Sequence, residues 1–339
     1  MDKQSTALTS AQDTTVRLPW LDVAKGLSIV SVVLFHAGSA APSGTTARTA
    51  WQVVDLGLFT FIMPLFFLVS GLVMGAALTL SFRAFLRKRV WPIAYLFVVW
   101  TAIYAVINLA TKGTVGGSLL DSLTLQTVLW YLAALGVYML IAWLTRKVPS
   151  VLVIAAAAVI AVPPAIFFPF DGWGLAHGPH FMVFFLLGCR LASSIIKRLQ
   201  KATWRDIAVL GSVAVIVGAI AVAVPALRAP VYALTPLISV PLVLIVSMWI
   251  SRRRSVSSAI EKLGKGSLGI FVIHQIVLSV VGLLLVPLLS PIGPFQWLLP
   301  LIAAGLAIGV AMLAWTFRAR YPLLFRPPRA PGPLAEQNP

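Results

Sequence analysis

With 339 residues, of which 60% are hydrophobic and only 10% charged, this chain cannot keep its apolar surface out of water as a soluble globule. Its mean hydropathy of +0.97 instead predicts an all-α polytopic membrane protein. A formal net charge of +17 would suit nucleic-acid binding, but the sequence shows no soluble domain that could bind a nucleic acid. We therefore expect the basic residues to face anionic lipids of the bilayer. The single cysteine, Cys189, excludes an intrachain disulfide and a cysteine metal site.

Apolar runs of about 20 residues predict about ten transmembrane helices between a disordered polar tail over 1–17 and a Pro-rich tail over 321–339. Basic side chains gather after every second predicted span, and by the positive-inside rule both termini and both tails are cytoplasmic. The membrane domain therefore covers 18–320. The predicted spans are 19–40, 52–78, 90–110, 124–145, 150–168, 179–196, 206–225, 231–250, 267–288 and 297–317.

The first span carries an acid, a base and an imidazole on one helical stripe. At 100° per residue, Lys25 and His36 fall within about 20° of each other, and Asp22 lies about 40° from His36. Eleven residues at 1.5 Å rise place His36 roughly 16 Å deeper than Lys25, near the middle of the bilayer. An ionisable side chain at that depth predicts a functional site.

A cleaved signal sequence is an alternative for this span, because Lys25, the apolar run to Phe35 and the small residues at 38–40 imitate one. Cleavage would remove His36. The long polar tail over 1–17 and Asp22 inside the span favour a retained helix.

Three further features follow in chain order. Asp55, early in the second span, either binds acceptor hydroxyls or pairs with Arg48. His177 and His180 beside Asp171 have metal-ligand spacing, but their place in a short loop favours a loop role. Tryptophans near span ends, such as Trp51 and Trp297, are typical of the membrane interface.

Several segments, in order and spacing, resemble the acyltransferase-3 superfamily of membrane-bound O-acyltransferases, close to the sugar O-acetylases. They are Leu21-Asp22-Val23-Ala24-Lys25-Gly26 with His36 eleven residues after Lys25; Met63-Pro64-Leu65-Phe66-Phe67-Leu68-Val69-Ser70-Gly71; Leu129-Trp130-Tyr131-Leu132; Leu263-Gly264-Lys265-Gly266-Ser267-Leu268-Gly269-Ile270-Phe271-Val272-Ile273-His274; and, more weakly, Phe184-Phe185-Leu186-Leu187-Gly188. We number the first four as motifs one to four.

The chain departs from the family pattern at three positions. Lys25 stands where the family often has arginine, which keeps the charge but loses the bidentate fork. Ile62 replaces a histidine often found before Met-Pro. After the second span, Leu86 occupies the first arginine position of Arg-x-x-Arg-x-x-Pro, while Arg89 and Pro92 keep the second half.

The resemblance implies transfer of an acyl group, which we expect to be acetyl, from cytoplasmic acyl-CoA to a hydroxyl of an envelope sugar, polysaccharide or glycolipid. His36 would act as general base, because histidine is the side chain poised near pH 7. Lys25 would contact the phosphates or thioester of the donor, and Asp22 would orient Lys25. Structural alternatives are a hydrogen bond of His36 between helices and an interfacial ion pair of Lys25 with Asp22.

The candidate substrate-binding residues include basic clusters for the donor and further residues within the predicted spans. Because CoA carries a pyrophosphate and a ribose phosphate, the cluster Arg87, Lys88 and Arg89 is the first candidate for the donor, and Arg252 to Arg254 the second. Topology alone would also explain either cluster. The remaining candidates are Ser267 and His274, which share a face of the ninth span, with Trp130, Tyr131 and Asp55.

The resemblance implies no permanently bound cofactor, with acyl-CoA as a substrate, and a multi-pass protein of the inner (plasma) membrane. Two other classes of function share the intramembrane charges. One is a transporter or flippase of a lipid-linked sugar or small metabolite, and the other is a membrane scaffold. Turnover of acyl-CoA distinguishes the enzyme from both.

Overall fold

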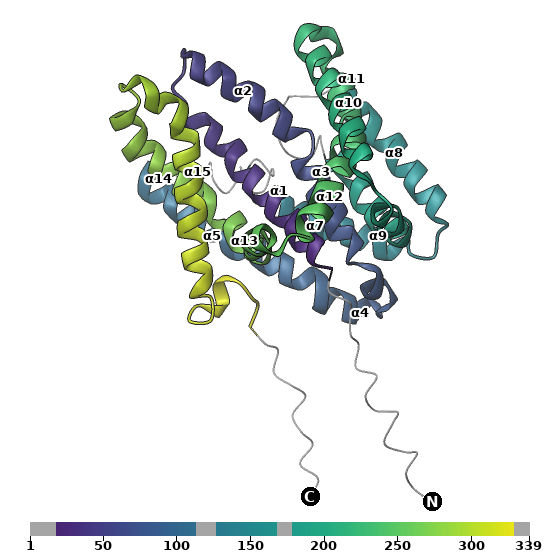
Figure 1. Ribbon diagram of the computed structural model, residues 1–339. Helices are drawn as coiled ribbons and strands as arrows, with labels where there is room; N and C mark the ends of the chain where they lie inside the picture. The colour runs from purple at the N-terminus through teal and green to yellow at the C-terminus, as the bar shows by residue number, and fades with distance from the viewer. Residues whose placement is uncertain (1–17, 113–126, 168–177, 329–339) are drawn as a thin grey trace, which may run out of the picture.

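A computed structural model describes residues 18–112, 127–167 and 178–328, and this part of the chain is helical without any strand (Figure 1). The expected all-α class is confirmed. The helices are α1 (Pro19–Ala37), α2 (Thr46–Phe59), α3 (Ile62–Leu72), α4 (Phe82–Phe85), α5 (Trp91–Lys112), α7 (Trp130–Leu144), α8 (Ser150–Phe167), α9 (Gly178–Gln200), α10 (Trp204–Ala223), α11 (Arg228–Leu234), α12 (Pro236–Ser251), α13 (Arg254–Lys265), α14 (Ser267–Leu289) and α15 (Gly293–Thr316). Short 3₁₀ turns include η1 (Gly38–Ala40) and η5 (Pro322–Leu324), and η3 (Leu86–Val90) is a π-helical turn.

Seven helical segments of the described residues are long and apolar enough to cross a membrane. The count becomes eight if α11 and α12, bent by 51° at their junction, form one span. Two shorter apolar helices, Trp130–Leu144 and Ser150–Ala161, coincide with two further expected spans. The figure of about ten spans therefore stays a prediction, whereas the multi-pass membrane class follows from these helices.

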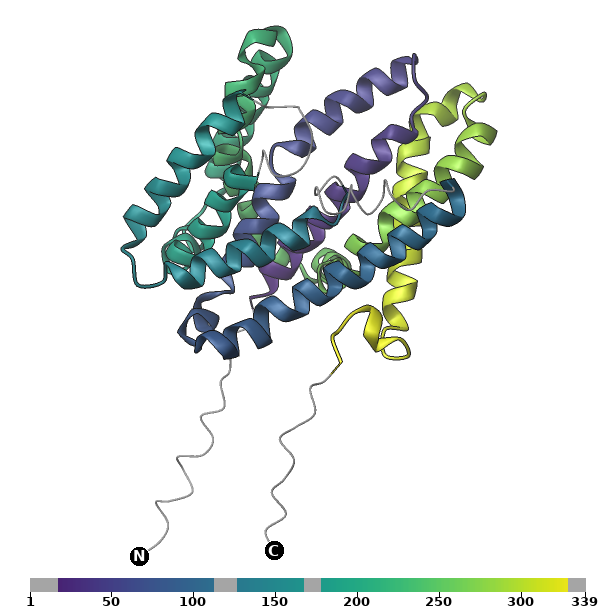
Figure 2. The ribbon, with the colours of Figure 1, turned by 180° about the vertical axis from the view of Figure 1, so that it is seen from behind.

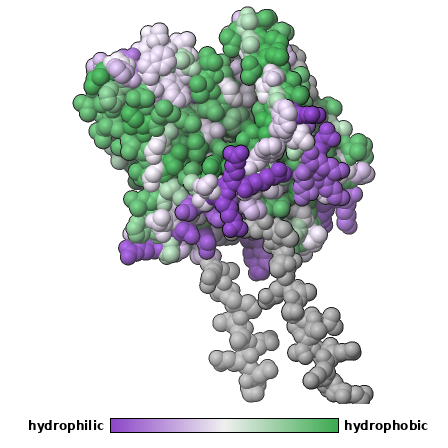
Figure 3. Space-filling view, in the orientation of Figure 1, coloured by the Kyte–Doolittle hydropathy of each residue, from purple (hydrophilic) through white to green (hydrophobic). Residues whose placement is uncertain are grey.

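Polar and apolar side chains occupy different parts of the surface (Figure 3). Hydrophilic residues gather over the lower part of the face shown, where α1 begins and α15 ends (Figures 1 and 2). We call this the polar end of the bundle. Large apolar side chains elsewhere are exposed, for example Val151 at 76%, Val215 at 72% and Leu283 at 70%. Such a belt suits contact with lipid hydrocarbon.

Helix α1 is the central element and packs against α3, α12, α13, α14 and α15. Its side chains Val23, Ala24, Ile29 and Val33 are fully buried. The close approach of α13 depends on Gly264, where a Cβ atom would overlap the main-chain carbonyl of Asp22. Small residues permit such backbone contact between membrane helices.

Helix α13 was not expected, because its charges, including Lys262 and Lys265, favour a cytoplasmic loop in the sequence. The structure instead folds the segment as a helix against α1. Its buried residues are Ser257 and Gly264, and Ile260 beside them lies against Gly26 of α1. Val256, Ile260 and Leu263 recur at helical spacing, which was a signal for this helix that its charges concealed.

The expected span over 52–78 is interrupted between α2 and α3. Pro64 has no N–H to donate to the carbonyl of Thr60, one turn earlier, so a continuous helix loses a hydrogen bond there. Ser239 Oγ of α12 lies 3.2 Å from this carbonyl oxygen and donates to it. The break is thus compensated by a neighbouring helix, as a buried polar group in a membrane requires.

The packed structure continues past residue 320, where we expected a tail. Phe325 is 7% exposed and lies against the rings of Trp100 and Trp315. Trp100 Nε1 donates to the carbonyl of Leu324 at 2.9 Å, and Tyr95 Oη donates to that of Leu323 at 3.0 Å. The segment after α15 therefore docks on α5. Residues 1–17 and 329–339 lie outside the described residues.

Candidate active site

A cavity of about 380 Å³ opens among α1, α3, α5, α7, α13 and α14. All four motifs contribute to its lining, although they are separated by up to about 240 residues of sequence. The lining residues are Asp22, Lys25, Val32, Met63, Phe66, Val69, Ser70, Ile93, Tyr131, Leu132, Leu135, Gly264, Lys265, Ser267, Leu268 and Phe271. The four motifs are therefore parts of one site rather than independent features of separate helices.

Two lysines supply positive charge to the cavity. Lys25 Nζ lies 3.9 Å from Asp22 Oδ1, and Lys265 Nζ lies 4.0 Å from Glu261 Oε2. Both lysine side chains stay partly exposed, at 32% and 43%. Partly exposed pairs of this kind are weak and can exchange a carboxylate for another anion. From the sequence, Lys265 was interpreted only as one of the basic residues that set the membrane topology. Its position inside motif four could have predicted a place in the site.

The middle of the cavity joins motif two to motif three. Ser70 Oγ and Tyr131 Oη are hydrogen-bonded at 3.0 Å. The Tyr131 ring lies 5.7 Å from that of Phe66 and 5.4 Å from that of Phe271, between centroids. These contacts hold the tyrosine rigidly between α3 and α14.

Two of the other candidates take different places. Ser267 lines the cavity beside Lys265. Trp130 does not line it, and packs instead against Phe67 and Phe181 with centroid separations of 6.0 and 5.5 Å. The substrate-binding role predicted for Trp130 thus stays a prediction without a direct place in the cavity.

His36 and His274 lie next to each other, with ring centroids 5.3 Å apart. His274 is fully buried and His36 is partly buried. Their depth on the two helices is comparable, as expected, but neither ring lines the cavity. Val32 and Phe271, the lining residues furthest along α1 and α14, occupy the space one helical turn before each imidazole.

The backbone fixes the tautomer of His274. Its Nδ1 lies 2.7 Å from the carbonyl oxygen of Phe271 and 3.1 Å from that of Ile270. Carbonyl oxygens only accept, so we assign the proton to Nδ1 and a lone pair to Nε2 in the neutral ring. Nε2 is buried and has no hydrogen-bond partner among the described residues. The pair therefore contains an unused acceptor beside His36.

Asp55 lies beyond the imidazoles, at the far end of α1. Its carboxylate packs against Gly38, where a Cβ atom would collide with it. Arg48 Nη1 donates to the carbonyl of Gly38 at 2.6 Å, and the two side chains form no ion pair with each other. Pairing of Asp55 with Arg48 was one of two expectations. The two side chains form no direct ion pair, but the charge of Arg48 still acts on the carboxylate, so both expectations for Asp55 stay predictions. Asp55 Oδ1 is buried and has no hydrogen-bond partner in the described part of the chain.

The basic stretch Arg87, Lys88 and Arg89 forms the exposed turn η3 directly before α5. None of the three side chains lines the cavity, but Ile93, one turn further along α5, does. A π-helical turn is frequent at functional sites. The alternative cluster, Arg252 to Arg254, is exposed at the junction of α12 and α13.

No group of three or more metal-ligating side chains occurs among the residues that the structure describes. His180 contacts the rings of Phe181 and Phe184. Asp171 and His177, which complete the metal-like spacing, lie outside the described residues.

Comparison with known proteins agrees with the convergence of the motifs. A family model described as an acyltransferase domain matches residues 18–317. The chain is 23% identical over 362 aligned positions to "Inner membrane protein YcfT" of Escherichia coli (strain K12). The alignment covers 93% of this chain and 98% of that protein. No solved structure matches. The chain is thus a multi-pass membrane protein that belongs to the acyltransferase-3 family of membrane acyltransferases.

Proposed function

We propose that this chain is an acyl-CoA-dependent O-acyltransferase of the inner (plasma) membrane. It would move an acyl group, which we expect to be acetyl, to a hydroxyl of an envelope sugar, polysaccharide or glycolipid. The observation that carries the proposal is the single cavity lined by all four motifs, which runs along α1 from Lys25 to within one turn of His36. Family membership supports the reaction class.

The donor would enter from the polar end, which we take to be cytoplasmic. By the positive-inside rule, the basic loops at that end are cytoplasmic. With ten spans, both termini would then be cytoplasmic as well. Lys25 and Lys265 would meet the thioester carbonyl and the pyrophosphate, and Arg87 to Arg89 the more distant phosphates. Charge-assisted hydrogen bonds to phosphate are among the strongest that a protein makes.

His36 would act as the general base. Its neutral imidazole accepts the proton of the acceptor hydroxyl while that oxygen attacks the thioester carbonyl carbon. The tetrahedral intermediate then collapses, the carbon–sulfur bond breaks, and the imidazolium returns the proton to the CoA thiolate. The products are the ester and free CoA, and the base is regenerated.

His274 and Asp55 would assist on the acceptor side. The free Nε2 lone pair of His274 can accept from a ring N–H of His36, which leaves the other nitrogen of His36 basic. The unpartnered Oδ1 of Asp55 can accept a hydrogen bond from an acceptor hydroxyl. Both atoms have the hydrogen-bonding capacity that these roles need.

The test is acyl transfer by the purified protein in lipid nanodiscs, with radiolabelled acetyl-CoA and an envelope carbohydrate fraction. We expect label in an alkali-labile ester with the wild type and with His180→Ala, a histidine control outside the cavity. We expect about 10²–10⁴-fold less label with His36→Ala. Movement of a lipid-linked sugar across the membrane without turnover of acetyl-CoA would contradict the proposal and favour the transporter.

A further inference from the structure

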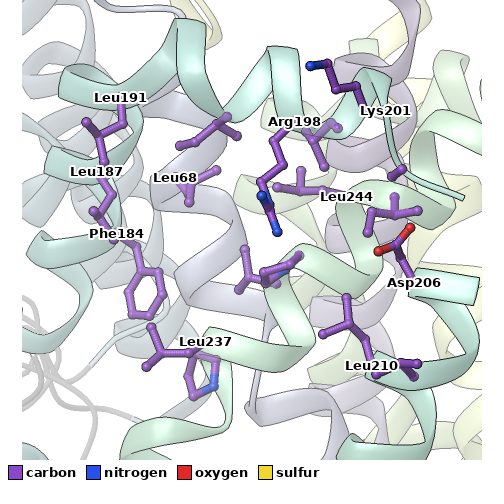
Figure 4. Close-up of a pocket in the computed structure, with 18 of the residues that line it drawn as sticks. Leu68, Phe184, Leu187, Leu191, Arg198, Lys201, Asp206, Leu210, Leu237 and Leu244 are labelled. Atoms are coloured by element: carbon purple, nitrogen blue, oxygen red, sulfur yellow. The ribbon is translucent and has the colours of Figure 1, made fainter.

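A second and larger cavity, of about 710 Å³, lies between α9, α10 and α12, on the other side of α3 from the candidate active site (Figure 4). We call it the α9–α12 groove. Its walls are apolar and include Leu68, Phe184, Leu187, Val240 and Leu244. Its lips carry Val209 and Leu237, which are 61% and 57% exposed. The groove therefore opens onto the apolar surface that faces lipid, and an occupant enters it from the bilayer.

Three cations stand at one end of this apolar space. Arg198 belongs to the last turns of α9, Lys201 to the connection after it, and Arg205 to the start of α10. Arg198 is exposed, and its side chain extends down toward the apolar walls of the groove (Figure 4). Among the described residues this guanidinium has no direct ion pair within 4 Å, and its charge interacts at longer range with the carboxylate of Asp206. An anionic ligand would find these donors available.

Among the described residues that line the groove Asp206 is the one acid, and its carboxylate is already engaged. Asp206 Oδ2 accepts from the main-chain N–H of Thr203 at 2.7 Å and from its Oγ1 at 2.8 Å, which caps the start of α10. Its carboxylate thus serves the helix, and three cations face one acid at this end. The combination of apolar walls with a cationic mouth is complementary to an amphiphile with an anionic head.

We propose that the α9–α12 groove binds one anionic diacyl phospholipid, with its phosphate against Arg198 and Lys201 and its acyl chains along the apolar walls. A lipid is favoured over a water-soluble ligand because the groove opens through exposed apolar lips. An anionic head is favoured over a zwitterionic one because the cations outnumber the single, engaged acid. The site is independent of the acyl-transfer proposal, since no residue of the groove lines the active-site cavity.

The groove nevertheless shares a wall with that cavity. Leu68 faces the groove, while Val69 and Ser70, the next residues of α3, line the cavity. Helices α3 and α9 touch through Gly71 and Gly188, where a Cβ atom on either glycine would overlap the backbone of the other helix. A lipid in the groove would therefore press on the helix that positions Ser70.

Native mass spectrometry of the detergent-purified full chain tests the proposal. The probes are phosphatidylglycerol and phosphatidylcholine with identical acyl chains. We expect one tightly bound phosphatidylglycerol and at least tenfold weaker binding of phosphatidylcholine. Arg198→Ala with Lys201→Ala should remove this preference, since each lost phosphate contact weakens binding by about tenfold or more. Arg318→Ala with Arg320→Ala, an exposed basic pair outside the groove, is the matched control and should keep it.

Val209→Trp with Leu237→Trp fills the lips at exposed positions, where the fold tolerates larger side chains, and should weaken binding of both lipids. The proposal would be overturned if the wild type bound the two lipids equally and the Arg198 and Lys201 variant bound them as the wild type does. Displacement of phosphatidylglycerol by glycerol phosphate at similar concentration would assign the cations to a soluble phosphate instead. Tighter binding of a polyprenyl phosphate would replace the diacyl occupant. Because lipid binding is measured rather than acyl transfer, failure here leaves the proposed reaction untouched.

Discussion

The two halves of α1 have different surroundings. The half from Asp22 to Val32 borders an open cavity, and its charged groups are partly exposed and weakly paired. The half that contains His36 borders His274 and, just beyond, Asp55. Nε2 of His274 and Oδ1 of Asp55 are buried without a hydrogen-bond partner among the described residues. The first half is suited to receive a large anion, and the second to accept protons or hydroxyls. One helix thus connects a binding region to a region with unused acceptors.

The sharpest test of this division is His36→Ala. We expect acyl transfer to fall by about 10²–10⁴-fold, the usual contribution of a general base, while the affinity for CoA stays at its wild-type value. Transfer is measured with radiolabelled acetyl-CoA, and affinity by calorimetry with CoA. An equal loss of CoA binding would show that the two halves of α1 are not separate.

The converse substitution is Arg89→Ala at the polar end. A charged contact to phosphate is worth about 1.5–3 kcal/mol, so Kd for CoA should rise by roughly 10- to 150-fold. Binding of the acceptor should not change. Calorimetry with CoA and dephospho-CoA distinguishes the ribose phosphate from the pyrophosphate as the partner of Arg89. Wild-type affinity for both would leave Arg87 to Arg89 as a signal of topology only.

The packing that holds the first half of α1 is tested by Gly264→Ala. The added methyl group meets the Asp22 carbonyl, and overpacking of this kind lowers the free energy of unfolding by about 1–3 kcal/mol. Gly282→Ala in α14 is the matched control, because nothing lies within 4 Å of a Cβ there. The control should be neutral or stabilising by up to about 1 kcal/mol. Thermal unfolding in detergent measures both, and equal stabilities would contradict the close α1–α13 contact.

The sequence could predict what depends on helical periodicity within one span. The shared stripe of Lys25 and His36 and the depth of His274 follow from spacing alone. It could not predict that the cavity reaches Val32 and Phe271 but is lined by neither imidazole, because that depends on how side chains from several helices fill the space. Hydropathy also cannot reveal the break at Thr60, which depends on Pro64 and a hydroxyl from Ser239, nearly 180 residues later. Helix α13 was missed for a different reason, because its apolar residues Val256, Ile260 and Leu263 have helical spacing but its charges were interpreted as those of a loop.

The smallest effect should come from Tyr131→Phe, which removes the hydrogen bond to Ser70 but keeps the ring among Phe66 and Phe271. A net hydrogen bond of this kind is worth about 0.5–1.5 kcal/mol, so acyl transfer should fall by only about 2- to 12-fold. Ser70→Ala should cost a similar amount, and the double variant little more, because both remove the same bond. A fall of 10³-fold in Tyr131→Phe would instead place the phenol at the reacting atoms, and the proton chemistry would then belong to the cavity rather than to the His36 half of α1.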